Sequence, residues 1–453
     1  MALTSIPEST PAMPASPSNP SQPADRPHRY FPSEPPAAGM PPIVRARATS
    51  SDPVEPDWER RPSITVGPAG SRDAGLAGGD HRVLQAGIDL MASLGGGTVH
   101  ILPGEFTLRA AVRLRSGVSL QGSGPETILR KHRSHTTRLI EDTDWYDREI
   151  TLDDPGDLDV GHDVCLQATN PHTGSRVVSK HTLTARSGRR FRLDRAPREN
   201  FWQMGDATAS SLFPLLSGEF IESVTLRGLS LDGNRAENAP LDGNHSGCIF
   251  MQDCRDIHIE EVEAHHSHGD GISWQICHDV TVRNCHSHHN FGLGLHPGSG
   301  SQRPCMVDNR LEHNSIGIFF CWGVKHGLAE GNRIQDSLRH GISVGHRDTD
   351  NRIRCNSIER SGEVGIYFRP ERGTDFCGHR NLVEGNTVRD TGGETAAAIH
   401  VQGAAHDLTF RRNTLEESRG PAERVGFRIH PEAERLLLED NRITGMARDV
   451  VRE

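Results

Sequence analysis

Short apolar runs alternate with polar turns along the second half of the chain, and the alternation has a constant period. A glycine followed by an apolar residue recurs every 21 to 25 residues, at Gly247, Gly271, Gly292, Gly317, Gly341 and Gly365, and less regularly through Ala398 and Gly426. A second column keeps step with it: Asn284, Asn309, Asn332, Asn356, Asn386, Asn413 and Asn441. A repeat of this length indicates a solenoid, because a propeller blade with four strands needs a longer unit.

Each repeat offers two or three strands of three to five residues, which corresponds to one coil of a parallel β-helix. The first and third residues after each glycine are apolar, as in Ile318 and Phe320 or Ile366 and Phe368. Because side chains alternate along a strand, these residues should point inward and stack on their counterparts in the coils above and below. The asparagine column should form a ladder of amide hydrogen bonds in a tight turn.

Three other segments depart from the repeat. Residues 1–62 hold 15 of the 28 prolines, a composition that predicts a disordered tail. Residues 63–130 should form an N-terminal cap and the first coils, with a helix over 81–92 and a strand over 98–102. The rhythm is lost between 131 and 220, where 181–195 reads as a hairpin of an inserted β subdomain. The main coils then occupy 221–453.

Composition narrows the function classes. The 453 residues carry a net charge of −10, so no basic field favours nucleic acid as a partner. No apolar run approaches the roughly 18 residues of a membrane helix, and no secretion signal is visible, so we expect a cytoplasmic protein without membrane contact. The nine cysteines are scattered singly, which is typical of small buried residues in a reducing compartment.

The N-terminal part carries a family resemblance. The segments LQAGIDLMASLGGGTVHILPGEFTL and RSGVSLQGSGPETIL, together with LDGN at 231–234, resemble the pectin-lyase-like superfamily over residues 78–130 and 220–446. The resemblance implies an all-β fold: a right-handed parallel β-helix solenoid with an N-terminal capping helix and a small inserted β subdomain. It also implies a polysaccharide or oligosaccharide partner, because that superfamily includes lyases, polygalacturonases, uronate epimerases and phage tailspikes.

Outward positions of the first strand of each coil predict a groove for such a polymer. The second and fourth residues after each glycine are polar, aromatic or cationic, which is unusual for a solvated sheet surface. Trp322 offers a flat face to a sugar ring. The predicted substrate-binding residues are Gln275, His296, Trp322, Glu371, His400, Gln402, Arg428 and His430.

The turns that follow these strands suggest β-elimination at a uronate. Lys325, Arg347 and Arg369 are 22 residues apart and could line up along the groove. Elimination needs a neutralised carboxylate, a base for the C5 proton and an acid for the leaving oxygen. We therefore expect Lys325 or His346 as base, Tyr367 as acid, and Arg347 and Arg369 as carboxylate binders. Lys-then-Arg placement on neighbouring coils resembles alginate and chondroitin lyases of this fold.

Several alternatives stay open from the sequence. A glycoside hydrolase needs two facing carboxyl groups, for which Asp270, Asp348, Asp350 and Glu371 are candidates without an obvious pair. A uronate epimerase, or a noncatalytic glycan-binding or structural protein, has the same fold. The same residues could also form a surface of structural ion pairs.

The cofactor requirement is unknown from the sequence. Ca²⁺ is an alternative through Asp270 or Asp348. Shared columns pair His265 with His286 and His268 with His289, but no third ligand is evident, so we expect no transition-metal site.

Overall fold

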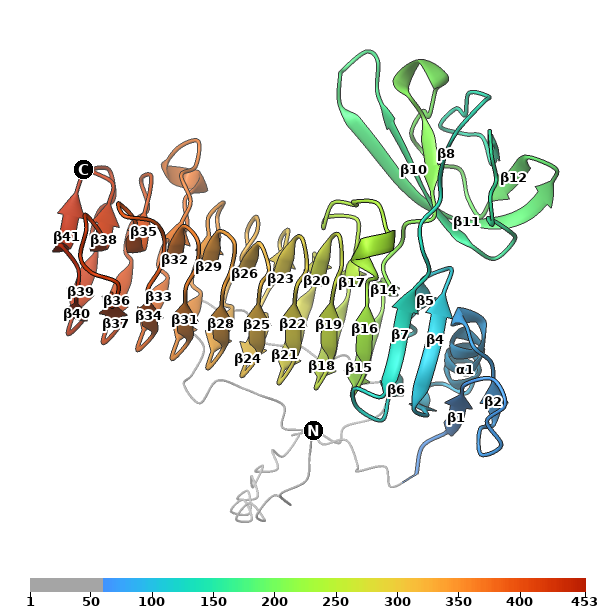
Figure 1. Ribbon diagram of the computed structural model, residues 1–453, viewed down its shortest axis with the longest axis horizontal. Coiled ribbons are helices and arrows are strands. Elements are labelled where there is room, and N and C mark those ends of the chain that lie inside the picture. The colour runs from blue at the N-terminus through green and yellow to red at the C-terminus, as the bar shows by residue number, and fades with distance from the viewer. Residues whose placement is uncertain (1–59) are drawn as a thin grey trace, which may run out of the picture. The chain divides into compact units, whose positions relative to one another are not determined.

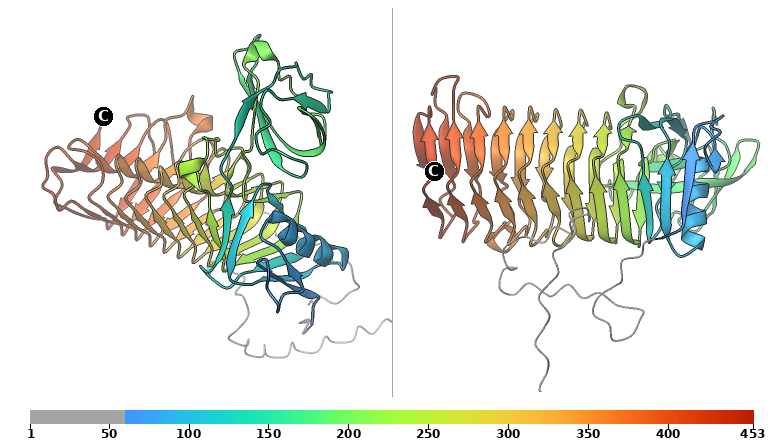
Figure 2. Two further views of the ribbon diagram at one scale, coloured as in Figure 1. Left: turned by 45° about the vertical axis from the view of Figure 1, so that its right-hand side comes forward. Right: turned by 90° about the horizontal axis from the view of Figure 1, so that it is seen from below.

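The computed structural model describes residues 60–453, so nearly all of the tail expected over 1–62 lies outside the described residues. The chain winds into coils of three parallel strands, one in each of three long sheets (Figures 1 and 2). This is the expected solenoid. Within residues 60–453, no helix is long and apolar enough to cross a membrane.

Sheets A, B and C follow one another in every coil. Sheet A has thirteen strands: β1 (Ser63–Gly67), β2 (Leu76–Ala77), β3 (Gly97–Ile101), β6 (Val118–Gln121), β15 (Glu222–Arg227), β18 (Arg255–Glu260), β21 (His278–Arg283), β24 (Cys305–Val307), β27 (Leu328–Glu330), β30 (Arg352–Arg354), β33 (Leu382–Glu384), β36 (Thr409–Arg411) and β39 (Leu437–Glu439).

Sheets B and C have eleven strands each. Sheet B contains β4 (Gly104–Leu108), β7 (Thr127–Lys131), β16 (Ser230–Asp232), β19 (Glu263–His265), β22 (His286–His288), β25 (Arg310–Glu312), β28 (Arg333–Gln335), β31 (Ser357–Glu359), β34 (Thr387–Arg389), β37 (Thr414–Glu416) and β40 (Arg442–Thr444). Sheet C contains β5 (Val112–Arg113), β14 (Leu216–Glu219), β17 (Gly247–Gln252), β20 (Asp270–Gln275), β23 (Leu293–Gly298), β26 (Ile316–Phe319), β29 (His340–Val344), β32 (Val364–Phe368), β35 (Ala397–Val401), β38 (Val425–Ile429) and β41 (Arg448–Arg452).

The glycine column marks the corner at which each coil turns from sheet B into sheet C. A Cβ on Gly341 would lie 2.4 Å from Cγ2 of Ile358 and 2.6 Å from the carbonyl oxygen of Gly365, so a side chain does not fit there. The column assigned from the sequence is wrong in one coil, because Ile272 pairs with Leu295 and Leu295 with Ile318. The corner glycine of that coil is therefore Gly294 and not Gly292.

Buried asparagines form the expected amide ladder. The Nδ2 group of each donates to Oδ1 of the next at 2.9 to 3.0 Å, through Asn309, Asn332, Asn356, Asn386, Asn413 and Asn441. Asn284 was wrongly placed in this column, since the amide of Cys285 donates to Asn309 while Asn284 is exposed. The ladder satisfies buried turn amides that no sheet pairs.

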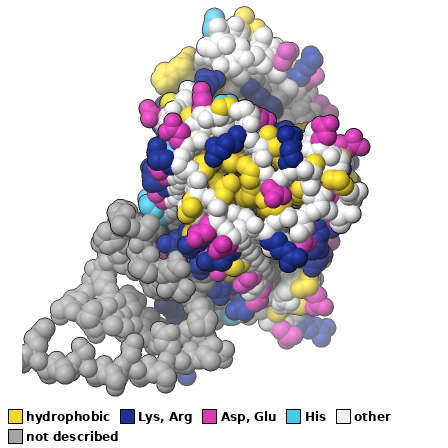
Figure 3. Space-filling view, turned by 90° about the vertical axis from the view of Figure 1, so that its left-hand side faces the viewer, with side chains coloured by type: hydrophobic (Ala, Val, Ile, Leu, Met, Phe, Trp, Pro, Cys, Tyr) yellow, Lys and Arg dark blue, Asp and Glu magenta, His cyan; other side chains and the backbone are white. Residues whose placement is uncertain are grey.

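The two ends of the solenoid differ. Helix α1 (His81–Ser93) covers the N-terminal end and buries Leu84, Ile88 and Met91 against the first coils. Figure 3 shows the C-terminal end, where apolar side chains form a patch rimmed by charged ones. Leu437 and Val450 are exposed there, because within residues 60–453 no further coil packs on the last one.

The insert is an antiparallel sheet with its own core, between the coil strands β7 and β14. Its strands run in the order β8 (Thr136–Arg138), β13 (Thr208–Ser210), β10 (Asp163–Thr169), β11 (Arg176–Ser187), β12 (Arg190–Leu193) and β9 (Glu149–Thr151). β11 and β12 form the hairpin expected over 181–195. Short 3-10 helices occupy η1 (Gln203–Gly205), η2 (Arg235–Glu237) and η3 (Thr374–Phe376).

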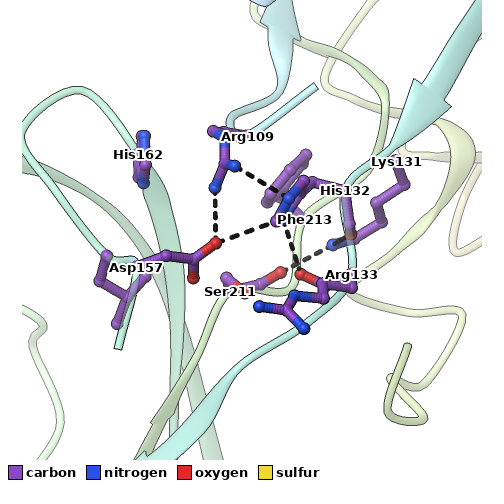
Figure 4. Close-up of a pocket in the computed structure, with 9 residues that line it drawn as sticks. Arg109, Lys131, His132, Arg133, Asp157, His162, Ser211 and Phe213 are labelled. Atoms are coloured by element: carbon purple, nitrogen blue, oxygen red, sulfur yellow. Dashed lines mark hydrogen bonds and ion pairs between the residues drawn. The ribbon is translucent and has the colours of Figure 1, made fainter. Parts of the chain in front are cut away.

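A small polar pocket lies where the insert leaves and rejoins the coils (Figure 4). Lys131 is buried there, donates to the carbonyl oxygen of Ser211 at 2.7 Å and lies 4.1 Å above the ring of Phe213. Burial lowers the pKa of Lys131 to about 7. Arg109 donates to Asp157 at 2.7 Å beside it. These groups satisfy one another, so we interpret the pocket as a structural junction.

Candidate functional site

The outer face of sheet C carries most of the predicted site residues, and strand register puts them into columns. One column runs Phe250, Ser273, His296, then Phe319, Ser343, Tyr367, His400 and Arg428, one residue per coil. A second column, two residues further along each strand, holds Gln275, Cys321, Arg369, Gln402 and His430. His296 therefore belongs to the first column and not to the second, because Gly294 is the corner residue of its coil.

The part of this face over β20 and β23 is covered. The segment 242–246 lies across it: the hydroxyl of Ser273 donates to the carbonyl oxygen of Gly243 at 3.4 Å. A Cβ on Gly243 would lie 2.2 Å from Oδ2 of Asp270. His296 and Gln275 are consequently buried, at 3% and 7% exposure. These two predicted binding residues do not reach solvent, which corrects their expected place in an open groove.

His296 and Asp270 form a buried ion pair. Nδ1 of His296 lies 2.7 Å from Oδ2 of Asp270, and the two side chains are 4% and 2% exposed. Burial acts to lower the pKa of His296, but the adjacent carboxylate and a contact with Cys321 outweigh it and raise the pKa to about 9. Asp270 also accepts from the amide of Leu293 at 2.8 Å, so the pair ties β20 to β23.

The face is open over β32, β35 and β38. Tyr367, His400 and Arg428 lie on these three consecutive strands, and all three side chains are partly exposed. The rings of Tyr367 and His400 are 5.7 Å apart. The hydroxyl of Tyr367 donates to Oε1 of Gln402, from the neighbouring column. The structure thus brings four of the predicted residues together on adjacent coils, which are spaced about 4.8 Å apart.

Electrostatics divide these groups into an acid, a base and a cation. Burial raises the pKa of Tyr367 above its usual value, so its hydroxyl keeps its proton at neutral pH. Burial, with help from Arg428, lowers the pKa of His400, so its ring is neutral. Nε2 of His400 is a buried atom without a hydrogen-bond partner among residues 60–453. Nε of Arg428 lies 3.7 Å from Oε1 of Glu453, and its Nη2 group donates to the carbonyl oxygen of Thr395 at 2.6 Å.

Sequence reasoning missed His340, a buried residue whose ring contacts this open face. Its ring lies 4.5 Å from that of Tyr367, and its Nε2 is 3.4 Å from Glu363. Burial lowers the pKa of His340 to about 4. The residue directly precedes the corner glycine Gly341, and strand alternation does not predict that this position faces outward. A histidine before the corner glycine would have been the signal.

Arg369 has partners of its own. Its guanidinium donates to the hydroxyl of Ser343 at 2.9 Å, to the carbonyl oxygen of Phe320 at 2.9 Å, and to the buried Asp348 at 3.2 Å. It also lies 4.2 Å above the ring of Phe319. Burial raises the pKa of Asp348 to about 6, although Arg369 and backbone amides counteract it. These contacts fix Arg369 across the floor of the face.

The turns after β26, β29 and β32 form a separate aromatic stack beside the floor. Trp322 stacks on His346 at 4.6 Å, and His346 contacts Phe376 at 5.1 Å. Nδ1 of His346 lies 3.3 Å from Glu371, and Arg347 covers Phe376 at 4.2 Å. Trp322 is 61% exposed, so the stack presents a flat apolar surface.

The expected line of Lys325, Arg347 and Arg369 is not formed. Lys325 pairs with Gln302 on one side and Thr349 on the other, in a column at the edge between sheets C and A. Arg347 turns away onto Phe376, and Arg369 lies on the floor. The period of 22 residues was misleading, because the three residues follow their corner glycines at different distances.

Each of the acidic candidates is engaged by a different partner. Asp270 is paired with His296, Asp348 with Arg369, and Asp350 with Arg380 at 2.8 Å, while Glu371 accepts from the amide of His346 at 2.6 Å. Their oxygens are occupied by N–H donors, which does not favour Asp270 or Asp348 as Ca²⁺ ligands.

Comparisons with known proteins agree with the topology. Residues 247–415 match the family described as right-handed beta helix region. No curated protein matches the sequence. Among solved structures, the A-module of mannuronan C-5 epimerase AlgE4 from Azotobacter vinelandii is similar with a TM-score of 0.54 and 16% identity, covering 82% of this chain and 95% of that one.

Two further structures have similar scores. One is titled glycoside hydrolase, with a TM-score of 0.52, 12% identity, and coverage of 85% of this chain and 97% of that one. The other is PfbA, a surface adhesin of Streptococcus pneumoniae, with a TM-score of 0.51, 11% identity, and coverage of 82% and 91%. At such identities the likeness shows the fold alone. The protein is an all-β, right-handed parallel β-helix protein of the pectin-lyase-like fold.

Proposed function

We propose that the open face of sheet C binds an acidic, uronate-containing polysaccharide and cleaves it by β-elimination. The observation that carries the proposal is the arrangement of Tyr367, His400 and Arg428 on three consecutive coils. They supply a protonated acid, a neutral base and a cation within one strip of partly exposed surface.

Each group has a role in the elimination. Arg428 neutralises the uronate carboxylate, which makes the C5 proton more acidic. The neutral imidazole of His400 takes that proton, the C4–O4 bond breaks, and a C4–C5 double bond forms. The hydroxyl of Tyr367 then donates its proton to the departing O4. The products are an unsaturated uronate end and a new hydroxyl end, so atoms and charges balance without a further reagent.

Neighbouring groups position the sugar. Gln402 and His430 lie in the column beside the three residues and can bind hydroxyl groups, while Trp322 can stack on a ring at the side of the floor. Arg369 carries a charge that Asp348 largely offsets, so we assign it to holding the floor together. The earlier assignment of Lys325 or His346 as base, with Arg347 and Arg369 as carboxylate binders, stays an alternative prediction.

Epimerisation at C5 is the second candidate, because one similar structure is named a mannuronan C-5 epimerase. It begins with the same removal of the C5 proton by a base and differs only when a proton returns from the opposite face. His340, on the other side of Tyr367 from His400, is placed to affect that second step. Hydrolysis is disfavoured because N–H donors engage each of the candidate carboxylates.

Incubation with a panel of uronate polymers tests the proposal. A lyase gives products that absorb in the near ultraviolet, an epimerase changes the ratio of uronates without cleavage, and a hydrolase gives reducing ends without the absorbance. His400→Ala and Tyr367→Phe should each reduce turnover by about 10²- to 10⁴-fold. His278→Ala and Tyr146→Phe, outside this face, are the matched controls and should retain full activity.

Two outcomes would contradict the assignment. Full activity of His400→Ala would exclude His400 as the base, and loss in Lys325→Ala or His346→Ala instead would favour the alternative. Binding of a polymer without any turnover would identify a glycan-binding protein. Parallel reactions with EDTA and with added Ca²⁺ test the cofactor alternative.

A further inference from the structure

A second concentration of ionisable side chains lies on the outer face of sheet B, where β16, β19 and β22 are neighbours (Figure 1). Strands β19 and β22 have the sequences EAH and HSH, in which the central Ala264 and Ser287 are buried. Both flanking residues of each strand therefore point outward. Histidines and carboxylates thus gather on adjacent coils, outside the site proposed above.

The register differs from the pairing that the sequence suggested. Glu263 pairs with His286 and His265 with His288. The ring of His265 consequently stacks on that of His288 at 5.1 Å and 7°, and not on His286. The same shift places His266 against His289, at 5.2 Å, so the expected pairing of His268 with His289 is also wrong.

A first set of three side chains converges on one point. Nδ1 of His265 lies 2.7 Å from Nδ1 of His266, because a left-handed turn residue (φ 51°) at His266 brings its ring back toward the strand. Oδ1 of Asp232, from the preceding coil, lies 3.9 Å from Nδ1 of His265. The three ligand atoms all lie within 4.8 Å of one another.

A second set repeats this arrangement one coil further along. Nε2 of His288 lies 3.2 Å from Oε1 of Glu263, and Nδ1 of His286 lies 3.9 Å from the same oxygen. The rings of His286 and His288 are 4.0 Å apart. Again the three ligand atoms lie within 4.8 Å of one another. Each set joins two coils.

Two imidazoles and one carboxylate are a ligand set that divalent transition metals prefer, with a fourth position left for water. We propose that each set binds one ion of the Zn²⁺ class and that the two ions cross-link the coils of β16, β19 and β22. A ladder of hydrogen-bonded histidines without metal is the competing explanation. That ladder explains the contact between Nδ1 of His265 and Nδ1 of His266, which is a hydrogen bond. It does not require a carboxylate oxygen within 4.8 Å of both histidines in two successive coils.

Neighbouring charged side chains engage mainly the atoms that do not face the two sets. Arg130 approaches Asp232 through Oδ2 at 3.4 Å, whereas Oδ1 faces His265 and also accepts from the amide of Asn234 at 2.8 Å. Glu312 approaches Nε2 of His286 at 3.0 Å, whereas Nδ1 is the atom of the second set. Each ligand side chain can therefore bind an ion through one atom while a neighbouring residue interacts with its other atom. Such interactions usually orient metal ligands.

Calorimetric titration of the full chain tests the proposal, with a protein that carries no polyhistidine tag and has been stripped by a chelator. Zn²⁺ is the probe, and Co²⁺ reports tetrahedral geometry through its visible absorption. The wild type should bind two ions. His265→Ala and His288→Ala should each bind one, and Zn²⁺ should raise the thermal unfolding midpoint of the wild type by more than that of either variant.

Controls separate ligand loss from misfolding. His278→Ala, an exposed histidine on β21 of sheet A, should still bind two ions. All variants should still unfold cooperatively in EDTA, because the replaced side chains point outward from sheet B and leave the solenoid core unchanged. No binding by the wild type, or undiminished binding by both variants, would overturn the proposal. If only one of the two variants binds one ion fewer than the wild type, the set that contains the other replaced histidine does not bind metal.

Discussion

The buried pair of Asp270 and His296 makes a quantitative prediction for Asp270→Asn. An asparagine preserves the shape and can still accept from the amide of Leu293, but it removes the charge that raises the pKa of His296 to about 9. The usual histidine pKa of 6.5 describes the unfolded chain. The difference of 9 − 6.5 units corresponds to about 3 kcal/mol of folding free energy at 1.36 kcal/mol per unit.

The sign of the pH dependence follows from the direction of the shift. Because the pKa of His296 is higher in the folded than in the unfolded state, its stabilisation is complete below about pH 6.5 and is lost as the pH rises through about 9. The difference in free energy of unfolding between the wild type and Asp270→Asn should therefore decrease by about 3 kcal/mol between these two pH values.

Urea unfolding at a series of pH values measures this difference. The buried Trp274, next to Ser273 on β20, provides an intrinsic fluorescence probe of the same region. Asp350→Asn, which removes a carboxylate paired with Arg380, is the control and should leave the alkaline slope unchanged. Parallel curves for the wild type and Asp270→Asn would refute the ion pair as described.

Four other predictions concern the coils and the site. Asn356→Leu breaks the ladder and leaves buried amide and carbonyl groups unpaired, so urea unfolding should show a loss of about 2–5 kcal/mol. Gly341→Ala places a Cβ 2.4 Å from Ile358 and should lower the thermal midpoint of unfolding, whereas unchanged stability would mean that the corner can open. Lys131→Met removes a buried ammonium whose pKa is about 7. The stability of this variant relative to the wild type should therefore fall as the pH rises from 7 towards 10.5, and a rise in unfolding curves measured over that range would contradict the prediction. The acid limb of the pH profile of activity should lie below pH 6.5, since burial lowers the pKa of His400; a limb above that value would exclude it as the base.

The periodic part of the fold was predictable because every coil packs on its neighbours in the same way. Inward apolar pairs, corner glycines and ladder asparagines each have a local reason, so their columns appear in the sequence. The error at Asn284 arose because Cys285, and not an asparagine, holds the ladder position of that coil. The error at Gly292 arose because Gly292 and Gly294 match the pattern equally well. Only the pairing of Leu295 with its neighbours in adjacent coils decides between them.

The site was less predictable, because its properties depend on contacts between distant segments. Alternation correctly placed Tyr367, His400 and Arg428 on one face. It could not show that the segment 242–246 covers His296, or that Asp348 engages Arg369. Turn residues such as Lys325 do not follow the alternation of a strand, so their column cannot be predicted from the period of the repeat.

Loss of the C5 proton of a uronate polymer is the most direct measurement of the proposed chemistry. Nuclear magnetic resonance in deuterated solvent follows that proton for cleavage and epimerisation alike. The account predicts that the wild type removes it from at least one polymer of the panel and that His400→Ala, folded as judged by its unfolding midpoint, does so about 10²- to 10⁴-fold more slowly. Retention of the C5 proton in every polymer, or equal rates for the two proteins, would contradict it.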